Sequence, residues 1–116
     1  MEVVNLSEKL AGFAEYYRPR TVAEFNNFDV MVVKALGPFV WHKHDDTDDF
    51  FLVLSGSLTI HLRDRSVSLG PGDLFIVPKG SEHCPVADGE VHLLLIEPKG
   101  TPNTGDQKTA AGRLLA

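Results

Sequence analysis

Three histidines and one aspartate in this chain have the side-chain types and the spacing of a metal-binding site. His42 and His44 are separated by one residue, Asp49 follows in the same segment, and His83 lies much further along the chain. Because successive side chains of a strand point to alternate faces, His42 and His44 would point the same way from an extended segment. On a helix the equivalent pair would be four positions apart. The spacing therefore predicts a divalent metal held between strands, with two exposed polar histidines on a strand face as the simpler alternative.

The predicted donor set defines a class of metal and leaves its identity open. Three neutral imidazoles and one carboxylate suit divalent Fe, Mn, Ni, Co, Cu or Zn. The carboxylate also has an alternative, because Asp48 directly precedes Asp49. Adjacent residues of a strand face opposite ways, so only one of these two aspartates can point toward the metal.

Two further reactive side chains are not assigned to the metal site. Cys84 follows His83 directly, so within a strand it should face away from the metal as a buried, unreactive thiol. His92 lies in an apolar segment, where it either lines a cavity or is a hydrogen-bonded core histidine. No residue is identifiable from the sequence as the proton-transferring base that an isomerase needs near pH 7.

The first element expected is a short N-terminal helix over Asn5–Ala14. Asn5 can cap this helix and Glu8 stands where a capping box requires an acidic residue. A second, frayed helix is a candidate over Gln107–Leu115, after an irregular stretch rich in Pro, Gly and Thr.

From Val22 onward the pattern changes to short strands. Glycine-containing turns separate them, and Gly56 and Gly72 are expected to adopt positive φ there. About eight short strands at this spacing indicate an antiparallel sandwich or barrel. The clearest candidates are Phe28–Leu36, Trp41–His44, Phe50–Leu54, Leu58–Leu62, Leu74–Val77, Glu82–Val86 and Val91–Glu97.

Composition indicates one ordinary globular domain. The chain has 116 residues, of which 43% are apolar and 23% charged, and its net charge is -5. This charge argues against nucleic acid or an anionic membrane surface as partner. No apolar run approaches a membrane span, no signal peptide is visible, and the single cysteine cannot form an internal disulfide. We therefore expect a cytoplasmic protein.

Two motifs in this chain resemble those of the cupin family. The first reads Gly37, four residues, His42, Lys43, His44, four residues, Asp49, six residues, Gly56, and the second reads Gly72, five residues, Pro78, Lys79, Gly80, two residues, His83. Three positions depart from the family pattern: one residue is missing after Gly37, Asp49 replaces the usual glutamate, and Ala87 replaces a frequent asparagine.

The resemblance implies an all-β double-stranded β-helix, a jelly-roll barrel, with a short N-terminal helix. It divides the chain into an N-terminal helix and lead-in over 1–20, a cupin barrel over 21–98 and a C-terminal tail over 99–116. It also implies His42, His44, Asp49 and His83 as ligands of one divalent transition metal, and favours Asp49 over Asp48. The chain is similar to small single-domain cupins, many of which are labelled mannose-6-phosphate isomerase-like.

Two classes of function follow as hypotheses. The first is a metal-dependent enzyme acting on a small oxygen-rich molecule by dioxygenation or isomerisation. Dioxygenation asks less of the protein, since no base is identifiable, and a sugar phosphate would need a cluster of Lys or Arg that is not found. The second is a non-catalytic binding or sensing module with a structural metal. Fold alone does not choose between them.

A homodimer is expected because a small barrel leaves strand edges to be covered. The apolar segment Val22–Leu36 is the candidate for pairing across a two-fold axis. The alternative is that the Asn5–Ala14 helix covers this edge and leaves a monomer. The ligand pocket is expected to be small and mostly apolar, with the metal at its floor and one end open to solvent.

Overall fold

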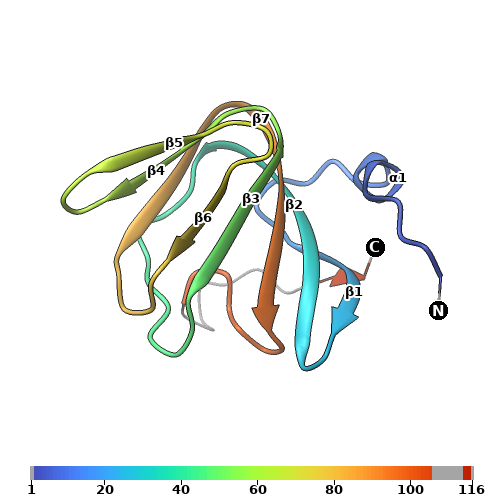
Figure 1. Ribbon diagram of the computed structural model, residues 1–116. Helices are drawn as coiled ribbons and strands as arrows, with labels where there is room; N and C mark the ends of the chain where they lie inside the picture. Colours follow the sequence, from blue (N-terminus) through green and yellow to red (C-terminus); the bar gives the residue numbers. More distant parts are fainter. Residues whose placement is uncertain (1, 106–113, 116) are drawn as a thin grey trace.

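The computed structural model describes residues 2–105 and 114–115, and these residues form a barrel of strands with one short helix outside it (Figure 1). This confirms the expected all-β class. The elements are α1 (Leu6–Ala11), β1 (Arg20–Phe25), β2 (Phe28–Pro38), β3 (Asp49–Ser55), β4 (Leu58–Leu62), β5 (Ser66–Leu69), β6 (Leu74–Val77), β7 (His83–Pro98) and β8 (Leu114–Leu115). Among the described residues, no helix is long and apolar enough to cross a membrane.

The long strand β7 connects the parts of the barrel. One edge of β7 pairs with β2 along most of its length, from Phe28↔Pro98 to Pro38↔Val86. The other edge pairs first with β4 and then with β3, which in turn pairs with β6. All of these pairings are antiparallel, as predicted. Strand β3 starts at Asp49 of the first motif, and β7 starts at His83 of the second. The arrangement brings these two strand starts to the same region of the barrel (Figure 1).

The sequence divided this long strand wrongly into Glu82–Val86 and Val91–Glu97. Gly37 pairs with Ala87 while Ala35 pairs with Val91, so three residues of β7 lie opposite one residue of β2. The intervening Asp88, Gly89 and Glu90 are exposed. They form an outward bulge within a continuous strand, and their polar composition resembles that of a turn.

The helix and the turns follow the local signals of the sequence. The side chain of Asn5 accepts a hydrogen bond of 3.0 Å from the backbone N–H of Glu8, which confirms the predicted cap. The helix ends at Ala11, with Gly12 as its C-cap, earlier than Ala14. Gly56 has φ of +83°, and a Cβ there would lie 2.6 Å from the carbonyl oxygen of Glu90, so this turn requires glycine.

Two other predicted elements differ in the structure. Trp41–His44 is not a strand, because only His42 forms an isolated bridge. Leu114–Leu115 belongs to a short strand parallel to β1 and not to a helix. The remainder of the predicted helix, residues 107–113, lies outside the described residues.

The barrel interior is apolar and follows the alternation of the strands. In β3, Phe51 and Val53 are buried, and in β7, Leu93 and Leu95 are buried. The other members of this core are Met31, Val33, Ala35, Leu58, Ile60, Leu69, Val77, Ala87 and Val91. Asp49 is two residues before Phe51 in β3, so its side chain points to the same inner face as Phe51 and Val53. The alternation that forms the apolar core therefore also places one carboxylate inside the barrel.

Candidate metal centre

The structure brings the four residues of the predicted site together inside the barrel. His42 and His44 lie in the segment between β2 and β3, Asp49 begins β3, and His83 begins β7. All four are buried, and one ligand atom from each lies within 4.8 Å of the others. The backbone also holds the two motifs in place, because Gly80 N–H donates a hydrogen bond of 2.7 Å to the carbonyl oxygen of His44.

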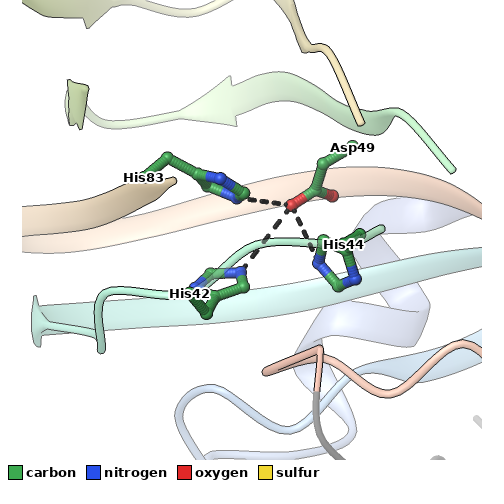
Figure 2. Close-up of side chains that lie close together, drawn as sticks. All are labelled: His42, His44, Asp49 and His83. Carbon is green, nitrogen blue, oxygen red and sulfur yellow. Dashed lines mark hydrogen bonds and ion pairs between the residues drawn. The ribbon is translucent and has the colours of Figure 1, made fainter. Parts of the chain in front are cut away.

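One carboxylate oxygen lies at the centre of the cluster. Oδ2 of Asp49 is 2.8 Å from Nε2 of His83, 3.3 Å from Nε2 of His44 and 3.9 Å from Nε2 of His42 (Figure 2). The three imidazole rings converge on that oxygen from two separate segments of the chain. Three nitrogen donors and one oxygen donor directed at a common region form a donor set suited to a divalent transition metal.

Hydrogen bonds behind two of the rings orient these nitrogens. Nδ1 of His42 lies 2.9 Å from the carbonyl oxygen of Val40, and Nδ1 of His83 lies 2.9 Å from the carbonyl oxygen of Ser81. A carbonyl oxygen only accepts, so each Nδ1 carries the proton and donates it. In a neutral imidazole, the opposite atom, Nε2, then presents a lone pair toward Asp49. This is the arrangement that metal-binding histidines commonly have.

The close approach of lone pairs at the centre requires a positive charge. Nε2 of a neutral His83 and Oδ2 of Asp49 are both acceptors, and they lie 2.8 Å apart. Two acceptors at this distance repel each other unless a proton or a cation lies between them. The residues present therefore fit a divalent cation at this point.

The carboxyl group of Asp49 is held in its charged form. Burial disfavours the carboxylate and raises its pKa, but hydrogen bonds from His42, His44 and His83 lower the pKa by more. The result is a pKa well below the usual range of an aspartate. A carboxylate whose ionised form is favoured, placed among three imidazoles, is an appropriate ligand for a cation.

Asp48, the alternative carboxylate, has another position and another partner. It is exposed, and its Oδ1 accepts a hydrogen bond of 2.9 Å from the backbone N–H of Lys79. Asp48 thus ties the first motif to the Pro78–Gly80 turn of the second. Of the two aspartates, the structure brings Asp49 to the cluster.

A small cavity lies beside the centre. Its volume is about 50 Å³, and His42 and Asp49 form part of its wall. Apolar side chains supply most of the remainder, including Val33, Phe39, Phe51, Leu93 and Leu95. This agrees with the small, mostly apolar pocket expected from the sequence.

Residues from both ends of the chain cover this cavity. Tyr17 and Asn103 line it, and the Asn103 side-chain amide donates a hydrogen bond of 3.2 Å to the carbonyl oxygen of Tyr17. The hydroxyl of Tyr17 donates to the carbonyl oxygen of Gly37. Burial raises the pKa of Tyr17 to about 12, with a smaller contribution from Cys84. Part of the segment predicted as an irregular tail thus helps to enclose the pocket.

Sequence reasoning did not identify Glu97, which also lines the cavity. Its exposed fraction is 4%, and it belongs to the inward phase of β7 with Leu93 and Leu95. A glutamate in the apolar phase of a buried strand is rare unless it has a partner or a role. Because Glu97 follows the continuous apolar run Leu93–Ile96, the sequence alone did not distinguish a buried glutamate from the exposed end of a strand.

The two other reactive residues lie away from the cluster. Cys84 is buried, and burial raises the pKa of its thiol despite the opposing charge of Arg63, as expected for an unreactive cysteine. His92 faces the outer surface, where its Nε2 is 2.7 Å from Oε2 of Glu90. It does not line the cavity.

Comparisons with known proteins identify one family. The Cupin domain family, Cupin_2, matches residues 29–97. Uncharacterized protein YdbB of Bacillus subtilis is 33% identical over 79 residues, which are 67% of this chain and 64% of that protein. A 3-hydroxyanthranilate 3,4-dioxygenase of Aspergillus terreus is 28% identical over 98 residues, which are 78% of this chain and 50% of that enzyme. The chain thus spans less than two thirds of the length of these curated relatives.

A solved structure extends the likeness to most of the chain. The crystal structure of a cupin-2 domain containing protein from Shewanella frigidimarina matches with a TM-score of 0.82 and 41% sequence identity. The match covers 84% of this chain and 95% of that chain.

Proposed function

This chain belongs to the cupin family, and from that premise we propose that it is a metal-dependent enzyme acting on a compact, oxygen-rich small molecule, with dioxygenation as its reaction. The observation that carries the proposal is the convergence of four buried ligand atoms within 4.8 Å of one another beside an apolar cavity. His42, His44, Asp49 and His83 would hold the metal. A divalent metal with open coordination positions supplies Lewis-acid polarisation of substrate oxygen atoms and, if redox-active, a route for electrons to dioxygen.

The residues of the chain would orient the metal ligands and exclude water. The carbonyl oxygens of Val40 and Ser81 fix the rings of His42 and His83 through their Nδ1–H groups. Phe51, Leu93 and Leu95 make the cavity apolar, which favours a ligand whose polar atoms lie at its metal-binding end. Exclusion of water strengthens every electrostatic contact at the centre.

The size of the cavity restricts the ligand. An apolar cavity of about 150 Å³ accommodates benzene, whereas this cavity measures about 50 Å³. A small keto acid or diketone has about as many non-hydrogen atoms as benzene, so it would fit only if the cavity widened around it. A hydroxylated ring, as the similarity to a 3-hydroxyanthranilate 3,4-dioxygenase suggests, would require the covering segment at Asn103 to move.

Dioxygenation is favoured over sugar-phosphate isomerisation because of the charges. The cavity wall contains no lysine or arginine among the described residues, and it includes the acidic Asp49 and Glu97. A buried phosphate without a cationic partner costs several kcal/mol. The mannose-6-phosphate isomerase-like label implied by sequence resemblance therefore receives no support from the wall of this cavity.

Oxygen consumption tests the proposed reaction. Protein loaded separately with Fe(II), Mn(II) and Zn(II) would be incubated with small keto acids, diketones and dihydroxybenzenes, and dioxygen uptake followed with an electrode. We expect uptake with a redox-active metal, no uptake with Zn(II), and none in the His44→Ala, His83→Ala double variant. Ligand binding without turnover for any metal would support the alternative, a binding or sensing cupin.

We also propose a cytoplasmic homodimer, by a different route from the one predicted. Strand β2 lies between β7 and β1, so both edges of the Phe28–Leu36 part of Val22–Leu36 are already paired within one chain. The outer face of β3 and β6 is more suitable, because Leu74 and Ile76 are 54% and 41% exposed. They lie opposite Leu52 and Phe50 in the β3–β6 ladder, so one apolar surface spans both strands.

A further inference from the structure

We propose that Tyr17 determines which ligands reach the metal, because its aromatic ring occupies the space that a ring-containing ligand would need. The inference rests on the proposed function in one respect, since it takes the apolar cavity as the place where a metal-bound ligand lies. It narrows the ligand class to compact aliphatic chelators, such as keto acids and diketones, and excludes chelators that carry an aromatic ring.

A row of ring contacts joins the side chain of Tyr17 to the metal centre. The Tyr17 ring stacks on the ring of Phe39, with the two centroids 4.7 Å apart and an angle of 23° between the planes. The Phe39 ring in turn meets the imidazole of His42 almost at a right angle, with centroids 5.2 Å apart. All three residues line the cavity. Because these contacts are made by rings, the side chain of Tyr17 belongs to the wall and lies one ring away from a metal ligand.

Hydrogen bonds at both ends of Tyr17 hold this ring in place. Its backbone N–H donates a hydrogen bond of 2.8 Å to the carbonyl oxygen of Lys34, and its hydroxyl donates to the carbonyl oxygen of Gly37. Its own carbonyl oxygen accepts a hydrogen bond of 3.2 Å from the side-chain amide of Asn103. The ring therefore cannot leave the wall without loss of the bond to Gly37.

The backbone of Tyr17 has a conformation that a tyrosine rarely adopts. Its φ is +57°, in the left-handed region where a bulky side chain is strained and glycine is not. Strain of this kind persists only where the surroundings enforce it, and it concentrates at functional sites. The backbone at this position favours glycine, so the advantage of tyrosine comes from the place that its ring occupies.

Tyr17 is also the part of the wall at which the cavity can gain room. Val33, Phe51 and Leu93 belong to β2, β3 and β7, and the strand ladders set their positions. Tyr17 lies outside the strands, in the segment between α1 and β1. A smaller side chain there would leave a space of about one aromatic ring, and apolar cavities left by truncated side chains bind benzene.

Hydroxamates with a common chelating group test the size limit. Acetohydroxamate carries a methyl group, benzohydroxamate a phenyl group and naphthohydroxamate two fused rings. Their affinities for Co(II)-loaded protein would be measured from changes in the visible absorption of the metal. We expect wild type to bind acetohydroxamate most tightly. Tyr17→Ala should bind benzohydroxamate more tightly than wild type does, by about tenfold or more, because one aromatic ring is removed from water. Its affinity for acetohydroxamate should be unchanged.

Further variants and the largest probe separate a size limit from a structural role. Tyr17→Gly also removes the ring and suits the positive φ, so it should behave as Tyr17→Ala does and serves if the alanine variant does not fold. Tyr17→Phe keeps the ring and should retain the preference of wild type. Tyr16→Ala removes an exposed neighbouring tyrosine that does not line the cavity, and it should retain that preference too. Naphthohydroxamate should gain nothing, because a space of one ring does not hold two.

Several results would overturn the role of Tyr17. Wild type that binds acetohydroxamate and benzohydroxamate equally, or binds neither, has no such size limit. The role also fails if Tyr17→Ala and Tyr17→Gly hold the metal and still exclude benzohydroxamate. Loss of metal from both variants would show that the residue supports the centre itself. An equal gain for naphthohydroxamate would show that Tyr17 only closes the entrance.

The inference and the proposed function fail in different ways. If the preference changes as expected but no dioxygen is consumed, the proposed reaction is refuted and the role of Tyr17 stands. If dioxygen is consumed but the preference does not change, the role of Tyr17 is refuted and the reaction stands. If wild type binds no metal, both fail.

Discussion

The backbones of His42 and His83 exchange two hydrogen bonds, 3.0 Å from His42 N–H to His83 O and 2.9 Å from His83 N–H to His42 O. This isolated bridge joins the two motifs at the centre itself. This bridge fixes the two backbones relative to each other, and the Nδ1 contacts of the two rings with Val40 and Ser81 then orient the side chains. Preorganisation of this kind reduces the entropy that ligands lose when a cation binds.

The first prediction concerns metal content. His44→Ala combined with His83→Ala should reduce bound divalent metal from about one per chain to none, because two of four donors are lost. Elemental analysis of protein purified without added metal measures this, and far-ultraviolet circular dichroism should still show a β-protein. His61→Ala is the matched control, since His61 contacts Ser66 at 2.6 Å on the surface. Full occupancy in the double variant would refute the assignment.

The second prediction distinguishes the two neighbouring aspartates. Asp49→Asn should abolish metal binding, because the ionised oxygen at the centre is replaced by a neutral amide. Asp48→Asn should keep the metal, because its Oδ1 can still accept from Lys79 N–H. Asp49→Glu should keep or improve affinity, since it restores the usual cupin side chain. Competition with a fluorescent chelator ranks the three variants, and the assignment is wrong if only Asp48→Asn loses metal.

The fold class and the grouping of His42, His44, Asp49 and His83 could both be predicted from the sequence. Strand alternation predicted the common direction of His42 and His44, although their segment has only one bridge and is not a strand. Hydrophobic alternation located β4 at Leu58–Leu62, and an apolar run between turn residues located β6 at Leu74–Val77, both with the bounds that the structure has.

Other features depend on contacts between distant segments. The continuity of β7 results from its pairing with β2 around a bulge, which local turn signals at Ala87–Glu90 cannot show. The role of Asn103 in covering the cavity depends on the return of its segment to Tyr17. Glu97 was overlooked because a single carboxylate in an apolar strand resembles the solvated end of that strand until its burial is known.

The third prediction concerns the ionisation of Tyr17. Burial raises its folded-state pKa to about 12, above the ordinary value of 10.0. The neutral hydroxyl therefore stabilises the folded state fully below pH 10, and this contribution is lost as the pH rises toward 12. The chain has two tyrosines, so Tyr16→Phe leaves Tyr17 as the sole reporter. Tyrosinate absorbance should rise near pH 12 in the folded variant and near pH 10 in urea; a folded midpoint near 10 would contradict the burial argument.

The fourth prediction concerns ligand class. In thermal-shift measurements, small oxygen chelators should raise the unfolding temperature of metal-loaded protein and leave metal-free protein unchanged. Ligands that bind only the folded state stabilise it by mass action, by about 2.7 kcal/mol at a hundredfold excess over Kd. Sugar phosphates should have no comparable effect, because the cavity wall has no cationic side chain among the described residues. Strong stabilisation by sugar phosphates alone would favour an isomerase.

The last prediction concerns assembly through the outer face of β3 and β6. Leu74 and Ile76 are large, exposed and adjacent to Leu52 and Phe50, so burying them against a second copy would remove apolar surface from water. Light scattering at micromolar concentration should give twice the 12.7 kDa mass of one chain. Leu74→Lys with Ile76→Lys should give a folded monomer, because two cations opposed across a two-fold axis repel. Ser68→Lys, on the exposed side of β5, is the control and should remain dimeric. A wild-type mass of one chain would refute the dimer, and a dimeric double variant would place the interface elsewhere.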